Sequence, residues 1–180
     1  MKTIGSTIIM LALVPSLFAD NSKELKLASP DGTHEIAFYQ KQVSPAVNEL
    51  CYRVDYKSQP VVNESRAGLE LDNRIWEMAL GARNLKQPAC WMDNLEVDSV
   101  TYQPETNLTW QPLYGERSSV RDHYRTGTLY LSKKDNSGYR LNIEVRAYNE
   151  GVAFRYFFPE HPKAIFHKVV GDLTEYALPA

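Results

Sequence analysis

The segment 110–124 concentrates the side chains that are best suited to chemistry in this sequence. Sugars are bound by hydrogen bonds from charged and amide side chains, with aromatic rings placed against apolar C–H faces. The same mixture suits a surface that docks on another protein domain, or a surface network of ion pairs. The candidate residues for carbohydrate binding or domain docking are Trp110, Tyr114, Glu116, Arg121, His123 and Tyr124.

Two carboxylates in this segment could in principle act as a catalytic pair. Glu116 and Asp122 lie six residues apart, in what the sequence suggests is a loop. Hydrolysis of a glycosidic bond needs two carboxyl groups about 5–9.5 Å apart. Arg117, Arg121 and Arg125 lie within the same stretch and offer each carboxylate an ion-pair partner instead. We therefore predict surface ion pairs here and no catalytic dyad.

The histidines and cysteines do not have the spacing of a metal site. His34, His161 and His167 are scattered along the chain, and neither Cys51 nor Cys90 has a histidine at ligand spacing. The two cysteines can form one disulfide or remain separate, partly buried thiols, and both alternatives stay open. We predict no metal ligand, no catalytic residue and no cofactor in this chain.

Composition limits the class of partner. The 180 residues carry a net charge of −2, with 43% hydrophobic and 11% aromatic residues. A near-neutral balance without a basic run argues against nucleic acid as a partner. The length and composition predict one ordered domain, and eleven tyrosines favour a β-rich core or an aromatic binding face.

The N-terminus has the features of an export signal. Lys2 precedes the almost wholly apolar segment 8–18, and Ala19 provides a small residue before a polar stretch. An apolar core helix or a membrane anchor is the alternative, but the segment is shorter than the ~20 residues that span a bilayer. We predict a signal peptide over 1–19, a mature domain over 20–180 without membrane contact, and a periplasmic or secreted location.

Period-two alternation dominates the mature chain. In 50–57, Leu50, Tyr52, Val54 and Tyr56 alternate with Cys51 and its polar neighbours, which is typical of a half-buried strand. The clearest hairpin joins 140–148 to 152–158, with 149–151 as a loop and Gly151 in the left-handed conformation. Further strands are predicted over 24–28, 34–39, 69–71, 95–102, 128–132 and 166–178.

These strands predict an all-β fold, an antiparallel β-sandwich or barrel. Turns are expected at 29–32 (Ser-Pro-Asp-Gly) and 58–60, and one or two helical turns at 75–85. The last predicted strand ends at Leu178 without a closing turn, which leaves an unpaired sheet edge. We therefore expect a sandwich that is truncated at its C-terminal end.

Three segments together resemble the N-terminal domain of glycoside hydrolase family 97. The first combines 29–32 with Tyr-Arg-Val-Asp-Tyr at 52–56 and Pro-Val-Val at 60–62; the second runs from 110–117 to 120–124; the third is 145–156. The resemblance implies a super-sandwich-like domain followed by a catalytic (β/α)8 barrel and a small β-domain. It implies exported bacterial exo-acting α-glycosidases, such as α-glucosidases and α-galactosidases, that act on α-linked oligosaccharides.

In that family the barrel holds the catalytic carboxylates, a calcium ion lies at the active site, and the N-terminal sandwich helps to complete the site. This chain contains no barrel, so we expect it to be inactive alone and to dock on a barrel. No calcium ligand is carried over, and Asp172 is interpreted as a strand or turn carboxylate. The alternatives are a stand-alone carbohydrate-binding module, or a truncated fragment without function.

Overall fold

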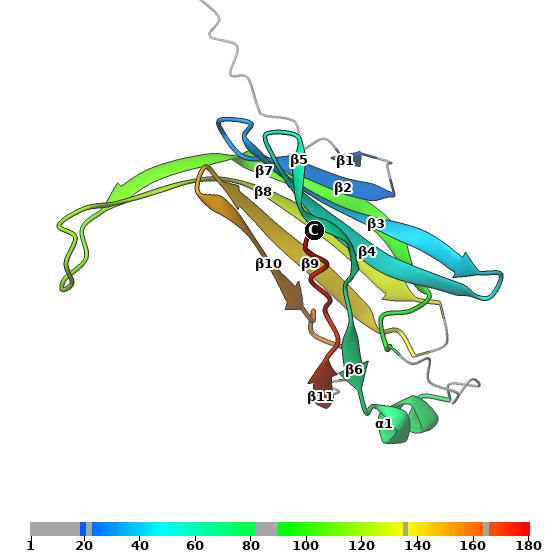
Figure 1. The fold of residues 1–180 in the computed structure, drawn as a ribbon. Helices are drawn as coiled ribbons and strands as arrows, with labels where there is room; N and C mark the ends of the chain where they lie inside the picture. Colours follow the sequence, from blue (N-terminus) through cyan, green and yellow to red (C-terminus); the bar gives the residue numbers. More distant parts are fainter. Residues whose placement is uncertain (1–18, 21–22, 82–89, 135–136, 164–165) are drawn as a thin grey trace, which may run out of the picture.

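The computed structural model describes residues 19–20, 23–81, 90–134, 137–163 and 166–180 (Figure 1). The predicted signal peptide lies outside these residues except for Ala19, which pairs with Thr101 in a short strand. Among the described residues, no helix has the length and apolar character needed to cross a membrane.

The fold consists of antiparallel sheets, which confirms the all-β prediction. A four-stranded sheet has the order β2 (Glu24–Ala28), β3 (His34–Ser44), β4 (Val47–Tyr56), β5 (Gln59–Arg66). A five-stranded sheet has the order β1 (Ala19–Asp20), β7 (Leu95–Trp110), β8 (Val120–Lys133), β9 (Arg140–Tyr148), β10 (Gly151–Phe157). A two-stranded sheet joins β6 (Leu69–Leu71) to β11 (Val169–Asp172), and the helix α1 spans Arg74–Ala79.

The core lies between the two larger sheets, where β2 and β3 contact β8 and β9. The alternation predicted for β9 is observed, since its inward residues are fully buried and its intervening residues are not. Removal of this apolar surface from water is the main stabilising contribution to the fold. Side chains that have no exposed surface include Leu25, Ile36, Phe38, Leu129, Leu141, Ile143 and Val145.

One face of β4 differs from the prediction. Cys51, expected on the polar face, is only 4% exposed, whereas Tyr56 on the expected core face is 40% exposed. Tyr39 lies directly opposite Cys51 on β3 and donates a hydrogen bond to Glu64, so polar side chains surround the thiol. Cys51 and Cys90 are both buried free thiols. Of the two alternatives, a disulfide or separate thiols, the structure therefore has the separate thiols.

Two predicted turns are shifted by local backbone geometry. Lys57 and Ser58 both have positive φ, as a two-residue hairpin turn requires, so β5 already begins at Gln59. The β9–β10 loop also has two residues instead of three, because Gly151 already pairs with Tyr148. The φ of Gly151 is positive, at 157°, but lies far from the αL value of about +57° that was predicted. The third turn, 29–32, is confirmed.

The C-terminal strand is shorter than predicted. Only Val169–Asp172 forms a strand, paired with β6, and the following segment continues beside β5 and β6 without regular ladder geometry. The Leu173 N–H donates to the Gly68 carbonyl, and the Asn63 N–H donates to the Ala177 carbonyl. The C-terminal segment therefore covers the β5 edge of the four-stranded sheet along this stretch.

Candidate functional site

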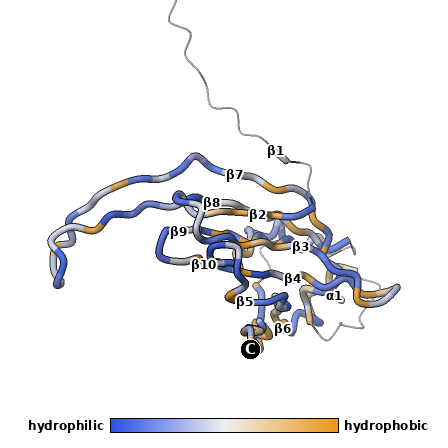
Figure 2. Tube along the Cα trace, turned by 45° about the horizontal axis from the view of Figure 1, so that its top comes forward, coloured by the Kyte–Doolittle hydropathy of each residue, from blue (hydrophilic) through white to orange (hydrophobic). Residues whose placement is uncertain are grey.

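The largest difference from the sequence prediction is at the candidate site. Strands were expected to end at Tyr102 and to resume at Thr128, with a loop between them. Instead β7 and β8 continue as a long hairpin that projects beyond the body of the sandwich (Figure 1). We call residues 104–125 the arm. Figure 2 shows that the arm extends away from the packed body and that β8 is largely hydrophilic there.

The arm does not bring the predicted site residues together. Trp110 pairs with Val120, so strand alternation places Trp110 and Tyr124 on one face of the hairpin. Arg121 and His123 have the opposite parity on β8 and point to the other face. The remaining two candidates, Tyr114 and Glu116, lie in the connection at the tip. The six residues therefore form three separate surfaces.

A β-bulge organises one face of the arm. Gln103 pairs with Thr126 and Thr106 with Tyr124, so Pro104 and Glu105 together oppose the single residue Arg125. Proline is tolerated at such a position because it needs no ladder partner for a backbone N–H. Glu105 lies outside the predicted segment 110–124, and its only local sequence signal is the proline that precedes it.

Glu105 is the central charged group on this face. Its Oε1 lies 2.6 Å from Nε2 of His123, and its Oε2 accepts a hydrogen bond from Nε of Arg125 at 3.1 Å. The hydrogen bond with His123, followed by the one with Arg125, lowers the pKa of Glu105 below its ordinary value. These contacts join β7 to β8 at the base of the arm.

The predicted ion pairs of Glu116 and Asp122 with the neighbouring arginines are wrong. Arg121 donates to the Asn107 side chain at 3.0 Å, and Arg125 is bonded to Glu105. Within the described ranges, neither Glu116 nor Asp122 forms a salt bridge. The partners of Arg121 and Arg125 are set by the residues that lie opposite them on β7. Proximity along the sequence does not determine them.

The other face of the arm continues onto the outer face of the five-stranded sheet. The Arg146 guanidinium lies 4.5 Å from the centroid of the Tyr124 ring, and the Tyr148 ring lies 5.1 Å from that of Tyr124. Arg155 pairs with Glu144 across the β9–β10 hairpin, at 2.6 Å.

The tip of the arm exposes apolar side chains to an unusual degree. Leu113 is 100% exposed, Tyr114 90% and Trp110 52%. Isolated exposed apolar residues are common, but a cluster at the end of a projecting element is a feature of interaction sites. This tip is the part of the predicted segment that best fits docking on another domain.

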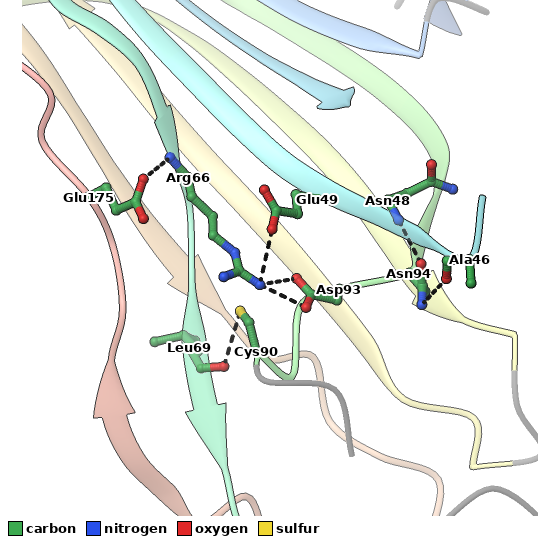
Figure 3. Close-up of polar contacts among 9 residues, drawn as sticks. All are labelled: Ala46, Asn48, Glu49, Arg66, Leu69, Cys90, Asp93, Asn94 and Glu175. Atoms are coloured by element: carbon green, nitrogen blue, oxygen red, sulfur yellow. Dashed lines mark hydrogen bonds and ion pairs between the residues drawn. The ribbon is translucent and has the colours of Figure 1, made fainter. Parts of the chain in front are cut away.

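A buried polar cluster links the C-terminal segment to the body of the sandwich (Figure 3). Nη2 of Arg66 donates to both carboxylate oxygens of Asp93, at 2.6 and 2.7 Å, and lies 3.5 Å from Glu49. Asp93 is only 5% exposed, so its charge depends on this partner. The Arg66 N–H also donates to the Glu175 carboxylate.

The histidines serve structural roles. His161 is buried, with Nε2 3.0 Å from the Ser137 carbonyl, and His167 contacts the Asn73 side chain at 3.2 Å. Their rings pack among Tyr139, Trp91 and Phe158. Burial, and then the charge of His161, lowers the pKa of His167.

The side chains present do not fit a calcium site. Calcium takes about six to eight oxygen ligands. Across the described parts of the chain, no three histidine, cysteine or acidic side chains are grouped so that they could hold a metal ion. The Asp172 carboxylate instead accepts hydrogen bonds from the backbone and hydroxyl of Thr174, as the turn carboxylate that the sequence predicted.

The fold and these motifs agree with the comparisons with known proteins. Residues 27–180 match the family described as Glycosyl-hydrolase 97 N-terminal. The match covers most of the chain, so the chain belongs to this family.

The relatives are much longer proteins. A retaining α-galactosidase from Bacteroides thetaiotaomicron is 26% identical over 97% of this chain, which spans 22% of that enzyme. A family 97 enzyme from Pseudoalteromonas sp. strain K8, solved in complex with panose and with acarbose, is 27% identical over 86% of this chain, with a TM-score of 0.67. A β-arabinopyranosidase, 18% identical, shares the fold with the same TM-score. The chain spans about one-fifth of each of these relatives, and it resembles their N-terminal β-domain.

Proposed function

We propose that this chain is the N-terminal domain of an exported α-glycosidase, which packs against a catalytic (β/α)8 barrel and completes its active site. The chain belongs to a family named for such domains, and its relatives include an α-galactosidase and an enzyme that binds panose. The substrate of the whole enzyme would be an α-linked oligosaccharide, and the location periplasmic or secreted.

The observation that carries this proposal is the arm. Its tip, with Leu113 and Tyr114, reaches beyond the sandwich and exposes apolar surface that the domain itself does not cover. The hydrogen bond between Glu105 and His123 and the ion pair between Glu105 and Arg125 join the two strands at the base of the arm. A rigid projection with an apolar tip is suited to contact the mouth of a barrel, where substrates enter.

The chain alone is proposed to be inactive in hydrolysis. The barrel would supply both catalytic carboxylates, and calcium would be bound with the residues of the catalytic region. The role of this chain is then positional, because it shapes the entrance and buttresses the barrel.

A site-specific cross-linking experiment tests the docking. A photoreactive residue is introduced at Leu113, or as a matched control at Ile75, which is 73% exposed on α1. The chain is mixed with a separately expressed catalytic region of a family 97 enzyme. We expect cross-links from position 113 to loops at the mouth of the barrel and none from position 75. Cross-links from position 75 alone, or none from either, would contradict the proposal.

A further inference from the structure

The outer face of the five-stranded sheet carries a polar groove that the arm-docking proposal does not use. The groove has a volume of about 470 Å³, within the range of about 300–1,000 Å³ that is usual for small-molecule sites. It lies over β7, β8, β9 and β10. Its lining consists of Gln103, Thr106, Tyr124, Thr126, Thr128, Tyr130, Asn142, Glu144, Arg146, Tyr148 and Arg155, with Ala153 and Phe154 on the β10 side.

The floor of this groove contains a polar group that lacks a partner. Thr128 is only 6% exposed and lines the groove. Among the residues that the structure describes, its hydroxyl has no hydrogen-bond partner, and neither do the side chains of Thr126 and Asn142. None of the three groups is among the fully buried side-chain atoms that lack a partner in the described residues, so all three open onto the groove. A ligand with several hydroxyl groups can hydrogen-bond to these side chains together.

The walls supply rings as well as hydrogen bonds. Tyr124 and Tyr148 lie at one end, 5.1 Å apart between ring centroids, and Tyr130 lies further along β8 towards the other end. Tyrosine rings pack against the C–H faces of sugars while their hydroxyls bond to sugar hydroxyls. The strand rise places Tyr124 and Tyr130 about 20 Å apart, enough for a short oligosaccharide to lie between them.

Each charged side chain of the groove has a partner within the groove, either an opposite charge or a tyrosine. Glu144 is paired with Arg155 at 2.6 Å, and the Arg146 guanidinium lies over the Tyr124 ring. The lining from β7 to β9 has no aliphatic side chain, and β10 adds Ala153 and Phe154. In contrast, the groove on the inner face of the sandwich is lined by Ile36 and by Val54, Val61, Val62 and Val152. An obligate protein interface would have an apolar centre. The one cation of the groove without a carboxylate partner, Arg146, is engaged by the Tyr124 ring and by the Tyr148 hydroxyl.

We propose that this outer groove binds a neutral oligosaccharide, with Thr128, Thr126 and Asn142 as hydrogen-bonding groups and the tyrosines as ring platforms. The site is separate from the tip of the arm and does not depend on a catalytic partner. Its role would be to hold a glycan chain on the domain beside the place where the chain is cleaved.

Titration of the isotope-labelled 180-residue chain with panose, followed by amide NMR, tests this site. We expect saturable shifts centred on Thr126, Thr128 and Asn142. Thr128→Val keeps the shape of the side chain and removes its hydroxyl, and it should weaken binding about threefold or more. Combining it with Asn142→Ala should weaken binding about tenfold or more. Amide dispersion in the absence of sugar verifies that each variant is folded.

Two controls separate this site from the other surfaces. Tyr114→Ala at the tip of the arm and Tyr176→Ala in the inner groove should leave panose binding unchanged. Shifts confined to either of those regions, or no shifts at all, would overturn the proposal. Broadening at Thr128 and Asn142 on addition of a catalytic region, with no response to panose, would assign this face to domain packing and also overturn it. If the arm does not dock on a catalytic region, the cross-links from position 113 will be missing. Panose would still bind to the outer groove, so the two proposals can fail separately.

Discussion

The carboxylate of Glu105 lies 2.6 Å from Nε2 of His123, across the bulge at the base of the β7–β8 arm. Arg125 completes the arrangement on the second carboxylate oxygen. The contact joins Glu105, which lies outside the predicted site segment, to His123, which lies within it. It joins the two strands where the arm begins, so it supports the projecting tip on which the docking proposal rests.

This arrangement predicts a measurable titration. The hydrogen bonds with His123 and Arg125 lower the pKa of the Glu105 carboxyl below its ordinary value. A lowered pKa in the folded state means that its contribution to the arm is present above the ordinary pKa and is lost as pH falls through the lowered one. Carboxyl carbon NMR of the wild type and of His123→Gln with Arg125→Gln tests this. The pKa of Glu105 should rise in the double variant; an unchanged value would contradict the role of the two contacts.

Removal of Arg66 should strongly destabilise the domain. Asp93 is 5% exposed and would remain as a buried charge without its bidentate partner, which costs about 3–5 kcal/mol. Arg74→Ala provides the matched control, because its ion pair with Asp72 is on the surface and contributes about 0–1 kcal/mol. Urea unfolding gives both free energies. An equal decrease in the free energy of unfolding of the two variants would show that the contact between Arg66 and Asp93 stabilises the domain no more than a surface ion pair does.

Gly68 should be intolerant of a side chain. A Cβ at this position would lie 2.9 Å from the Leu173 Cβ and 3.0 Å from the Leu173 carbonyl oxygen. Gly68→Ala should displace the C-terminal segment, cost about 1–3 kcal/mol and speed amide exchange at Leu173 and Glu175. Gly171→Ala meets the flexible end of Glu70 at 3.2 Å and should cost less. If amide exchange at Leu173 and Glu175 is unchanged in Gly68→Ala, the close packing of Gly68 against Leu173 does not hold the C-terminal segment in place.

The two cysteines should be unreactive in the folded chain. Burial, followed by the charges of Glu64 and Glu49, raises the pKa of Cys51 to about 11, and burial also raises the pKa of Cys90. The thiolate is the reactive form, so alkylation near neutral pH should be slow until the chain unfolds. Thiol titration should find no accessible thiol in the native chain and two after denaturation. Rapid labelling of either cysteine in the native chain would contradict the burial described.

Much of the fold could be predicted because apolar alternation reports burial on one face. Strand β9 is the clearest case, since Leu141, Ile143, Val145 and Ala147 all face the core. The arm lacked such a pattern because neither of its faces is buried, and its polar residues therefore resembled a loop. Cys51 was misplaced because polar side chains on neighbouring strands cover it, which no single-strand pattern reveals.

The candidate site was predicted less well for a related reason. The sequence placed Trp110, Tyr124, Arg121 and His123 in one surface, but strand parity sends the first two and the last two to opposite faces. The partner of His123 comes from a bulge eighteen residues earlier. Cross-strand register is a long-range property that depends on the partner strand, so composition within a segment cannot supply it.

The most direct test of the docking proposal is the thermal unfolding of the chain alone and with a separately expressed family 97 catalytic region. A partner that binds only the folded chain should raise its Tm by about 5 °C or more at about a hundredfold excess over Kd. Leu113→Asp should leave the Tm of the free chain unchanged, since the side chain is 100% exposed, and should remove the increase. An unchanged Tm for the wild type with the catalytic region, or an equal increase in Leu113→Asp, would contradict the account.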